Sequence, residues 1–218
     1  MKNLKKKVLL AAVALSLVAI VSMGTLAWFS DSDEVTNKFM VTDSETNPDK
    51  IFSVELYETK VDEDGVPVAP YEKTDANVYD NIAPGDVLTK DPTIENTGKY
   101  DQWIRVIVTV DNADAWIAAL GNGYDLGTIF GGHDETAWTR YEVGTYDNNT
   151  YTMTYYLNSK LAAGDKVVLF ETVNIPTELT QEDMVFVGGE FELKIVAQAL
   201  QYDNTGDNCY DAFANFWN

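Results

Sequence analysis

Alternating apolar and polar residues predict a series of β-strands along the chain. The clearest is Trp103–Val110, in which every second residue from Ile104 is aliphatic and the opposite face is also largely apolar around Arg105. A strand that is apolar on both faces is typical of the interior of a sheet. The same alternation predicts further strands over Val35–Val41, Ile51–Tyr57, Val87–Glu95, Trp138–Val143, Tyr151–Leu157, Lys166–Ile175 and Glu190–Leu200.

Turn residues separate these predicted strands. In Pro84-Gly85 the proline fixes φ at the second position of a turn and the glycine supplies φ > 0 at the third, which predicts a type II turn. The segment Asp147–Asn149, between two predicted strands, predicts a hairpin. Pro92 cannot donate a ladder hydrogen bond, so it predicts a sheet edge or a bulge in its strand.

Helical patterns are short, and they cover Asp114–Leu120, Thr177–Asp183 and Tyr210–Trp217. A βαβ architecture needs long helices between the strands, and these are missing from the pattern. We therefore predict an all-β fold, a jelly-roll or Greek-key β-sandwich with short helices in the connections. No internal repeat is visible, so one domain is expected.

The first 27 residues have the pattern of a secretory signal peptide. A basic cluster precedes an apolar run over Val8–Val21, and small residues lead to Ala27. Thr25 and Ala27 suit the −3 and −1 pockets of a signal peptidase, which predicts cleavage between Ala27 and Trp28. As a helix the run rises about 21 Å, less than the roughly 30 Å hydrocarbon core, which favours cleavage over the alternative of an uncleaved signal anchor.

Three segments are therefore expected: a signal peptide over 1–27, a mature N-terminal segment over 28–43 and the jelly-roll domain over 44–218. The net charge of the 218-residue chain is −20, and cleavage would remove four lysines and no acids. The remaining 191 residues carry 11 Lys and Arg against 35 Asp and Glu, a net charge of −24. This charge repels nucleic acid and anionic lipid, so we expect neither nucleic acid nor, after cleavage, a membrane as partner.

Cys209 is the only cysteine of the chain. An intramolecular disulfide is therefore excluded, and stability must come from a hydrophobic core. The acidic neighbours Asp207 and Asp211 are expected to raise the pKa of this thiol and to reduce its nucleophilicity.

Several short motifs together resemble the secreted TasA and camelysin-type (CalY) proteins. They are Gly24–Asp31, Asn37–Phe39, Pro84–Asp86, Glu95–Gly98, Leu169–Pro176 and Val196–Gln201. The resemblance implies a jelly-roll subunit of extracellular fibres in a biofilm matrix, exported through a dedicated signal peptidase. It also implies that the mature N-terminal segment of one subunit completes the sheet of its neighbour.

Strand addition to an open sheet edge gains a ladder of main-chain hydrogen bonds, and alternate side chains fill pockets. The segment from residue 28 to residue 41 can span about 45 Å when extended. The apolar residues expected to anchor it as a donor strand are Trp28, Phe29, Val35, Phe39 and Val41. Two alternatives stay open: this strand folds back into its own sheet as the first strand, or a self-paired monomer opens when it polymerises.

Catalysis has little support in the sequence. Zincins need two histidines one helical turn apart, whereas His133 is the only histidine and lies in a glycine-rich loop. A Gly-x-Ser-x-Gly elbow is also missing, so we expect no enzyme and no catalytic residues. Calcium is a more credible ligand than zinc at Asp31–Glu34 and Asp62–Gly65, but neither segment matches an EF-hand, and solvated turns explain both. We therefore expect no cofactor.

The prediction from sequence is a secreted structural protein that self-assembles into extracellular biofilm-matrix fibres by donation of its N-terminal strand. Its expected partners are further copies of itself, other matrix proteins and, during export, a signal peptidase. Its expected location is the extracellular matrix or the cell surface. Two alternatives belong to other classes: a secreted camelysin-like metallopeptidase, and a monomeric adhesion or carbohydrate-binding module that uses exposed Trp and Tyr side chains.

Overall fold

The computed structural model of the chain describes residues 30–35, 52–62, 65–79, 82–142, 144–186, 192–203 and 205–216. By its internal contacts the chain divides into two compact units, Met1–Ser30 and Asp31–Asn218, and the description below concerns the second unit. The cleavage residues Ala27 and Trp28 lie outside the described residues.

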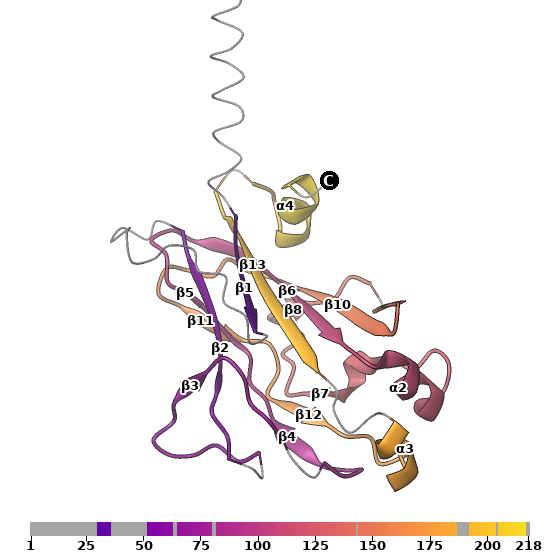
Figure 1. Ribbon diagram of the computed structural model, residues 1–218. Coiled ribbons are helices and arrows are strands. Elements are labelled where there is room, and N and C mark those ends of the chain that lie inside the picture. Colours follow the sequence, from indigo (N-terminus) through magenta and orange to yellow (C-terminus); the bar gives the residue numbers. More distant parts are fainter. Residues whose placement is uncertain are drawn as a thin grey trace, which may run out of the picture. The chain divides into compact units, whose positions relative to one another are not determined.

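A six-stranded sheet forms the centre of the fold (Figure 1). Its strands, in spatial order, are β1 (Ser30–Val35), β13 (Leu193–Gln201), β6 (Gln102–Val110), β10 (Thr150–Leu157) and β8 (Trp138–Thr139), and β9 (Thr145–Asp147) also pairs with β10. β6 pairs antiparallel along its whole length with β13 and over most of it with β10. The prediction that Trp103–Val110 is an interior strand is therefore confirmed.

Two smaller sheets complete the β-structure of the described chain. One has the order β11 (Lys166–Val168), β5 (Thr93–Asn96), β2 (Val54–Thr59) and β3 (Lys73–Thr74). The other has the order β4 (Val87–Thr89), β12 (Thr172–Asn174) and β7 (Phe130–Gly131). The pairings within both sheets are antiparallel, so the all-β class is confirmed, whereas the jelly-roll order of the strands stays a prediction.

Val87–Glu95 and Lys166–Ile175 are each broken into two strands, which corrects the prediction of one strand each. β4 pairs with β12 in one sheet, and β5 pairs with β11 in the other. Pro92 lies at this break, where its carbonyl accepts a hydrogen bond from Leu169 N–H at 3.0 Å. Leu169 and Phe170 are fully buried there. The two segments thus cross together from one sheet to the next.

Helices are few in the described part of the chain, and they lie in connections. They are α2 (Ala113–Leu120), the 3₁₀ helix η1 (Leu126–Ile129), α3 (Gln181–Phe186) and α4 (Cys209–Phe216). Three of them overlap the helical patterns seen in the sequence. None of the described helices is long and apolar enough to cross a membrane.

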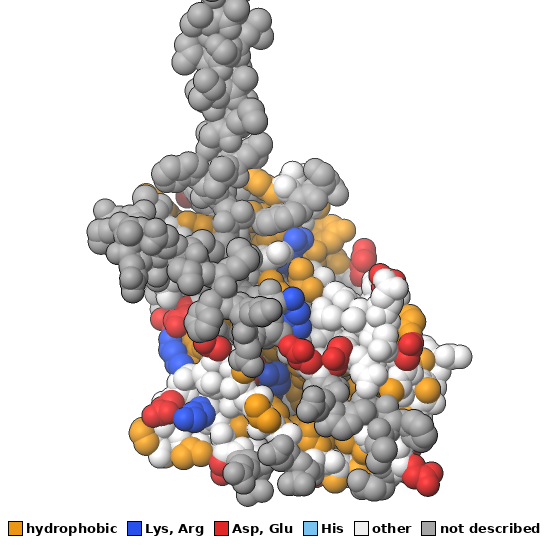
Figure 2. All heavy atoms as spheres, viewed as in Figure 1, with side chains coloured by type: hydrophobic (Ala, Val, Ile, Leu, Met, Phe, Trp, Pro, Cys, Tyr) orange, Lys and Arg blue, Asp and Glu red, His pale blue; other side chains and the backbone are white. Residues whose placement is uncertain are grey.

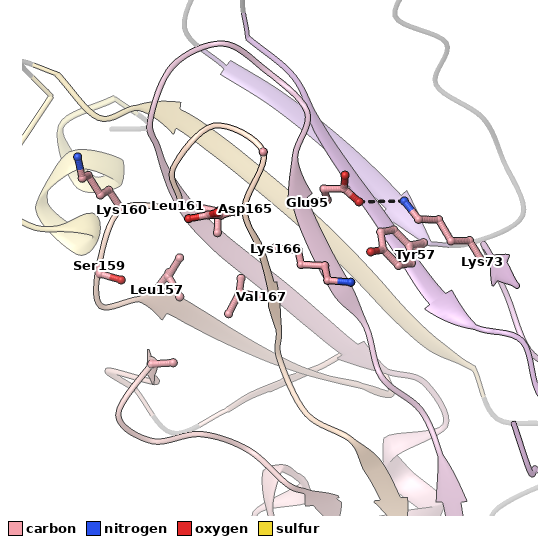
Figure 3. Close-up of a pocket in the computed structure, with 12 residues that line it drawn as sticks. Tyr57, Lys73, Glu95, Leu157, Ser159, Lys160, Leu161, Asp165, Lys166 and Val167 are labelled. Atoms are coloured by element: carbon pink, nitrogen blue, oxygen red, sulfur yellow. Dashed lines mark hydrogen bonds and ion pairs between the residues drawn. The ribbon is translucent and has the colours of Figure 1, made fainter. Parts of the chain in front are cut away.

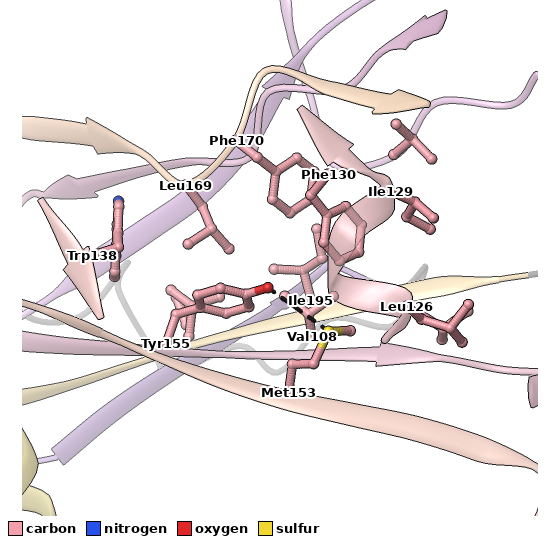
Figure 4. Packing of buried hydrophobic residues seen from close by; sticks show 14 of the residues in the cluster. Val108, Leu126, Ile129, Phe130, Trp138, Met153, Tyr155, Leu169, Phe170 and Ile195 are labelled. Carbon is pink, nitrogen blue, oxygen red and sulfur yellow. Dashed lines mark hydrogen bonds between the residues drawn. The ribbon is translucent and has the colours of Figure 1, made fainter. Parts of the chain in front are cut away.

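The main core lies against one face of the six-stranded sheet. Every inward residue of β6 from Ile104 to Val110 has 0% exposure, as the alternation predicts. In Figure 4, Val108 and Ile195 of the sheet face Phe130 and Phe170, whose rings stack with centroids 4.3 Å apart. The opposite face of the sheet is covered in part by α4, which buries Trp103, Leu200, Cys209, Ala212 and Phe213.

Candidate functional site

The outer edge of the six-stranded sheet is the candidate site for assembly. β1 lies at this edge, and among the described strands its one neighbour in the sheet is β13. β1 has six residues, whereas β13 has nine and pairs with β6 along all of them. β13 therefore has one side that is fully paired and one side on which only β1 lies in the described chain. Residues 30–35 are thus self-paired in this structure, which is one of the arrangements that the sequence leaves open.

The predicted donor-strand anchors fall at the limits of what is described. Val35 is the last residue of β1, and the structure places its backbone at the sheet edge. Trp28, Phe29, Phe39 and Val41 lie outside the described residues. Their role as anchors therefore stays a prediction.

A hollow of about 830 Å³ opens beside β5 and β11 (Figure 3). Lys73 and Tyr57 lie on one side of it and Ser159 and Lys160 on the other. Lys73 Nζ lies 3.8 Å from the centroid of the Tyr57 ring and 2.9 Å from a carboxylate oxygen of Glu95. The lining has three lysines, two carboxylates and two hydroxyl groups, so its charges are mixed.

Ion pairing accounts for the electrostatics of this hollow. Burial acts to lower the pKa of Lys73, but its hydrogen bonds to Glu95 and Glu55 raise that pKa above its ordinary value. The Lys73 hydrogen bond in turn holds the pKa of Glu95 below its ordinary value. Both groups are therefore charged at neutral pH. Paired charges of this kind can bind a polar ligand.

His133 packs against the core. Its Nδ1 lies 2.9 Å from the carbonyl oxygen of Leu169, and its ring meets Tyr155 edge-on with centroids 5.1 Å apart.

No group of three or more His, Cys, Asp and Glu side chains is arranged to hold a metal among the residues that the structure describes. Of the calcium candidates, Asp62 accepts a hydrogen bond from Val66 N–H at 2.9 Å, as a turn does, and the side chains of Asp31–Glu34 are not described.

Cys209 is buried, with 3% exposure, beneath the first turn of α4. Its Sγ–H donates a hydrogen bond to the carbonyl of Ile104 at 3.1 Å. Burial raises the pKa of the thiol to about 12. The direction predicted from sequence is confirmed, but desolvation is the main cause, and the acidic neighbours Asp207 and Asp211 are not among the causes.

Exposed aromatic side chains in the described chain are tyrosines. Trp103, Trp116 and Trp138 are at most 4% exposed, so these tryptophans form no surface platform for a glycan. Tyr71 and Tyr141 are 75% and 53% exposed. On the face seen in Figure 2, acidic side chains are interspersed with apolar and uncharged ones.

Two polar clusters, one buried and one partly buried, were not predicted from sequence. Glu58 of β2, which has 0% exposure, pairs with Lys90, which has 7% exposure, at 2.5 Å. Asp125 pairs with Arg140 near the end of α2. Each pair joins residues that are far apart in the chain, and neither has a motif that would identify it.

Comparison with known proteins assigns no family to this chain. A scan against protein-family models, a search of curated proteins and a search of solved structures each give no match to this chain. The resemblance to TasA and camelysin-type proteins rests on the sequence motifs alone and stays a prediction.

Proposed function

We propose that this protein is an exported subunit of extracellular fibres, and that it assembles when the segment 28–43 of one copy adds a strand to the β13 edge of the next. The observation that carries the proposal is the place of β1 at the outer edge of the six-stranded sheet, where β13 is its one neighbour among the strands that the structure describes. An edge strand near the chain's N-terminal region can leave its sheet without separating any other pair of strands. β6, by contrast, is held on both sides.

Exchange of this strand costs little free energy. The main-chain hydrogen bonds that β1 makes to its own β13 are replaced by the same bonds to the β13 of another copy. New contacts between the two copies then decide whether the self-paired form or the exchanged form has the lower free energy. Because each copy donates at one site and accepts at another, the contact is heterologous and extends into a filament when the rotation does not close.

Electrostatic repulsion opposes this assembly. The subunit that begins at Trp28 has a net charge of −24, so copies repel one another at low ionic strength. The Debye length falls from about 30 Å at 0.01 M salt to about 8 Å at 0.15 M. We therefore expect fibres to form faster as salt is raised, and divalent cations to act in the same direction.

Negative-stain electron microscopy tests the proposal. A protein that begins at Trp28 is compared with one that begins at Ser44, after removal of the donor segment. Filaments from the first and monomers from the second are the expected result. Monomers from both, at high concentration and with calcium added, would refute the homopolymer and favour a monomeric adhesion module.

A matched pair of proline variants tests whether a strand is donated. Successive N–H groups of a β-strand point to opposite sides, so only one of Ser32 and Asp33 directs its N–H to β13. Proline is tolerated at an edge strand where the N–H faces solvent. We expect one of Ser32→Pro and Asp33→Pro to abolish filaments and the other to keep them. Equal behaviour of the two variants would contradict assembly through a β-ladder.

A further inference from the structure

A lysine and an asparagine meet at the two oxygens of one buried carboxylate. Glu58 Oε1 lies 2.5 Å from Lys90 Nζ, and Glu58 Oε2 accepts a hydrogen bond from Asn77 Nδ2 at 3.2 Å. Glu58 lies in β2, Lys90 follows β4, and Asn77 follows β3. Glu58 and Lys90 are 0% and 7% exposed. Three strands therefore bring a buried amine and a buried carboxylate together with a half-buried carboxamide.

The Asn77 carboxamide is held at each of its polar atoms. Its Oδ1 accepts a hydrogen bond from Val61 N–H at 3.0 Å, and its Nδ2 also donates to the carbonyl of Thr59 at 2.9 Å. A donor on the carbonyl oxygen polarises the Cγ–Oδ1 bond and stabilises negative charge that develops on the oxygen. The carbon atom is thereby made more electrophilic, and the orientation of the group is fixed.

We propose that Lys90 and Asn77 form an intramolecular isopeptide bond and that Glu58 transfers the protons. Proton transfer from Lys90 to Glu58 across their short contact gives the neutral amine that the attack requires, together with a neutral acid. Lys90 Nζ then attacks Asn77 Cγ, the Nζ–Cγ bond forms, and the Cγ–Nδ2 bond breaks. Glu58 supplies a proton to Nδ2 from Oε2 and receives at Oε1 the proton that Nζ loses as the amide forms. The departing ammonia takes this last proton and leaves as ammonium, which restores the Glu58 carboxylate.

The reaction needs no oxidant, metal or co-substrate. Its reactants are the side chains themselves, and its products are one amide and one ammonium ion, which carries away the charge of Lys90. The bond would join the segment that follows β3 to the end of β4, and so close a covalent loop in a protein whose single cysteine excludes an internal disulfide. This inference is independent of fibre assembly.

Intact-mass spectrometry of the full chain as purified is the direct test, after its N-terminus has been determined. The expected mass is about 17 Da below the value calculated from the sequence, the mass of one ammonia. Glu58→Gln, Lys90→Met and Asn77→Ala are each expected to have the full calculated mass. Lys60→Met, which removes an exposed lysine that also pairs with a glutamate, serves as the control and should keep the deficit.

Peptide mapping locates the bond. Trypsin cleaves after free lysine but not after an amidated one, so the linked protein should yield one peptide covering 74–99, uncleaved after Lys90 and lighter by about 17 Da. A succinimide at Asn77 has the same deficit but leaves Lys90 cleavable, and that result would overturn the proposal. A folded protein of full calculated mass, cleaved normally after Lys90, would overturn it as well.

Discussion

The Asp125 carboxylate and the Arg140 guanidinium form a two-point ion pair that ties the loop after α2 to the chain after β8. Arg140 Nη1 donates to Asp125 Oδ1 at 2.9 Å, and Nη2 contacts Oδ2. Gly127 N–H and the Tyr151 hydroxyl donate to the same Oδ1, at 2.9 and 3.0 Å. One carboxylate thus joins η1, β10 and the end of β8.

We expect Asp125→Asn to lower the free energy of unfolding by roughly 2 kcal/mol, because it leaves the partly buried Arg140 without a counter-charge. Urea denaturation at pH 7 measures this. Glu72→Gln is the control, since its pair with Lys60 is about 60% exposed on both sides and should change stability by less than about 0.5 kcal/mol. Equal effects of the two substitutions would contradict a special role for Asp125.

The pKa of Asp125 predicts how the protein responds to acid. Burial acts to raise this pKa, but Arg140, Gly127 N–H and the Tyr151 hydroxyl outweigh it and hold the pKa below its ordinary value. A carboxyl with a lowered folded-state pKa contributes stability above the unfolded-state pKa of about 3.9, and this contribution is lost as pH falls through the folded-state value. Below pH 4 the wild type should therefore lose more stability than Asp125→Asn. Parallel pH profiles of the two proteins would contradict this.

Gly127 leaves room for the guanidinium. A Cβ built at this position would lie 2.0 Å from Arg140 Nη1. The arginine end is flexible in general, but here Asp125 fixes it, so Gly127→Ala should act by breaking the ion pair. We expect Gly127→Ala and Asp125→Asn to be non-additive, with the double variant little less stable than the worse single variant. Additive losses in urea denaturation would show that the alanine acts elsewhere.

The parts of the fold that follow from local pattern could be predicted from sequence. A strand with one buried face has an apolar residue at every second position of the sequence. This alternation in Trp103–Val110 is sufficient to identify β6. The turn at Pro84-Gly85 was also predictable: Gly85 has φ 90°, and Asp86 N–H donates to the carbonyl of Ala83 at 3.1 Å. These features depend on neighbouring residues alone.

The parts that depend on distant contacts could not be predicted. The change of sheet at Pro92 depends on which strands pair with β4, before the proline, and with β5, after it. Asp125 and Arg140 are 15 residues apart, and Glu58 and Lys90 are 32 apart, with no spacing rule to connect either pair. The hairpin turn was predicted correctly, but its first strand is Thr145–Asp147 and not the predicted Trp138–Val143, because the two-residue turn fixes the register.

That hairpin turn also caps α2. Asn148 and Asn149 have φ of 48° and 64°, as the central residues of a type I′ turn require. Asn149 alone has a second role: its Oδ1 accepts a hydrogen bond from Asp114 N–H at 2.8 Å, in the first turn of the helix. We expect Asn148→Gly to be neutral or stabilising by up to about 0.5 kcal/mol, and Asn149→Gly to cost about 1 kcal/mol through the lost cap. Thermal denaturation compares them, and an equal effect at both positions would exclude the cap.

Cys209 offers a readout of how α4 is held on the sheet. Its thiol is buried, donates to Ile104, and has a pKa raised by burial to about 12, so at pH 8 only about one thiol in ten thousand is ionised. Since the thiolate is the reactive form, disulfide exchange with a chromogenic reagent should be at least about 100-fold slower in the native protein than in 6 M guanidinium chloride.

Phe213→Ala should raise the native rate of this exchange, because Phe213 packs with Cys209 between α4 and the sheet and its loss allows the helix to open. Asn215→Ala, on the exposed side of the same helix, is the control and should leave the rate within about twofold. Thiol reaction in the native wild type as fast as in the unfolded chain would show that α4 does not protect Cys209. A native rate unchanged by Phe213→Ala would show that opening of the helix does not limit the reaction.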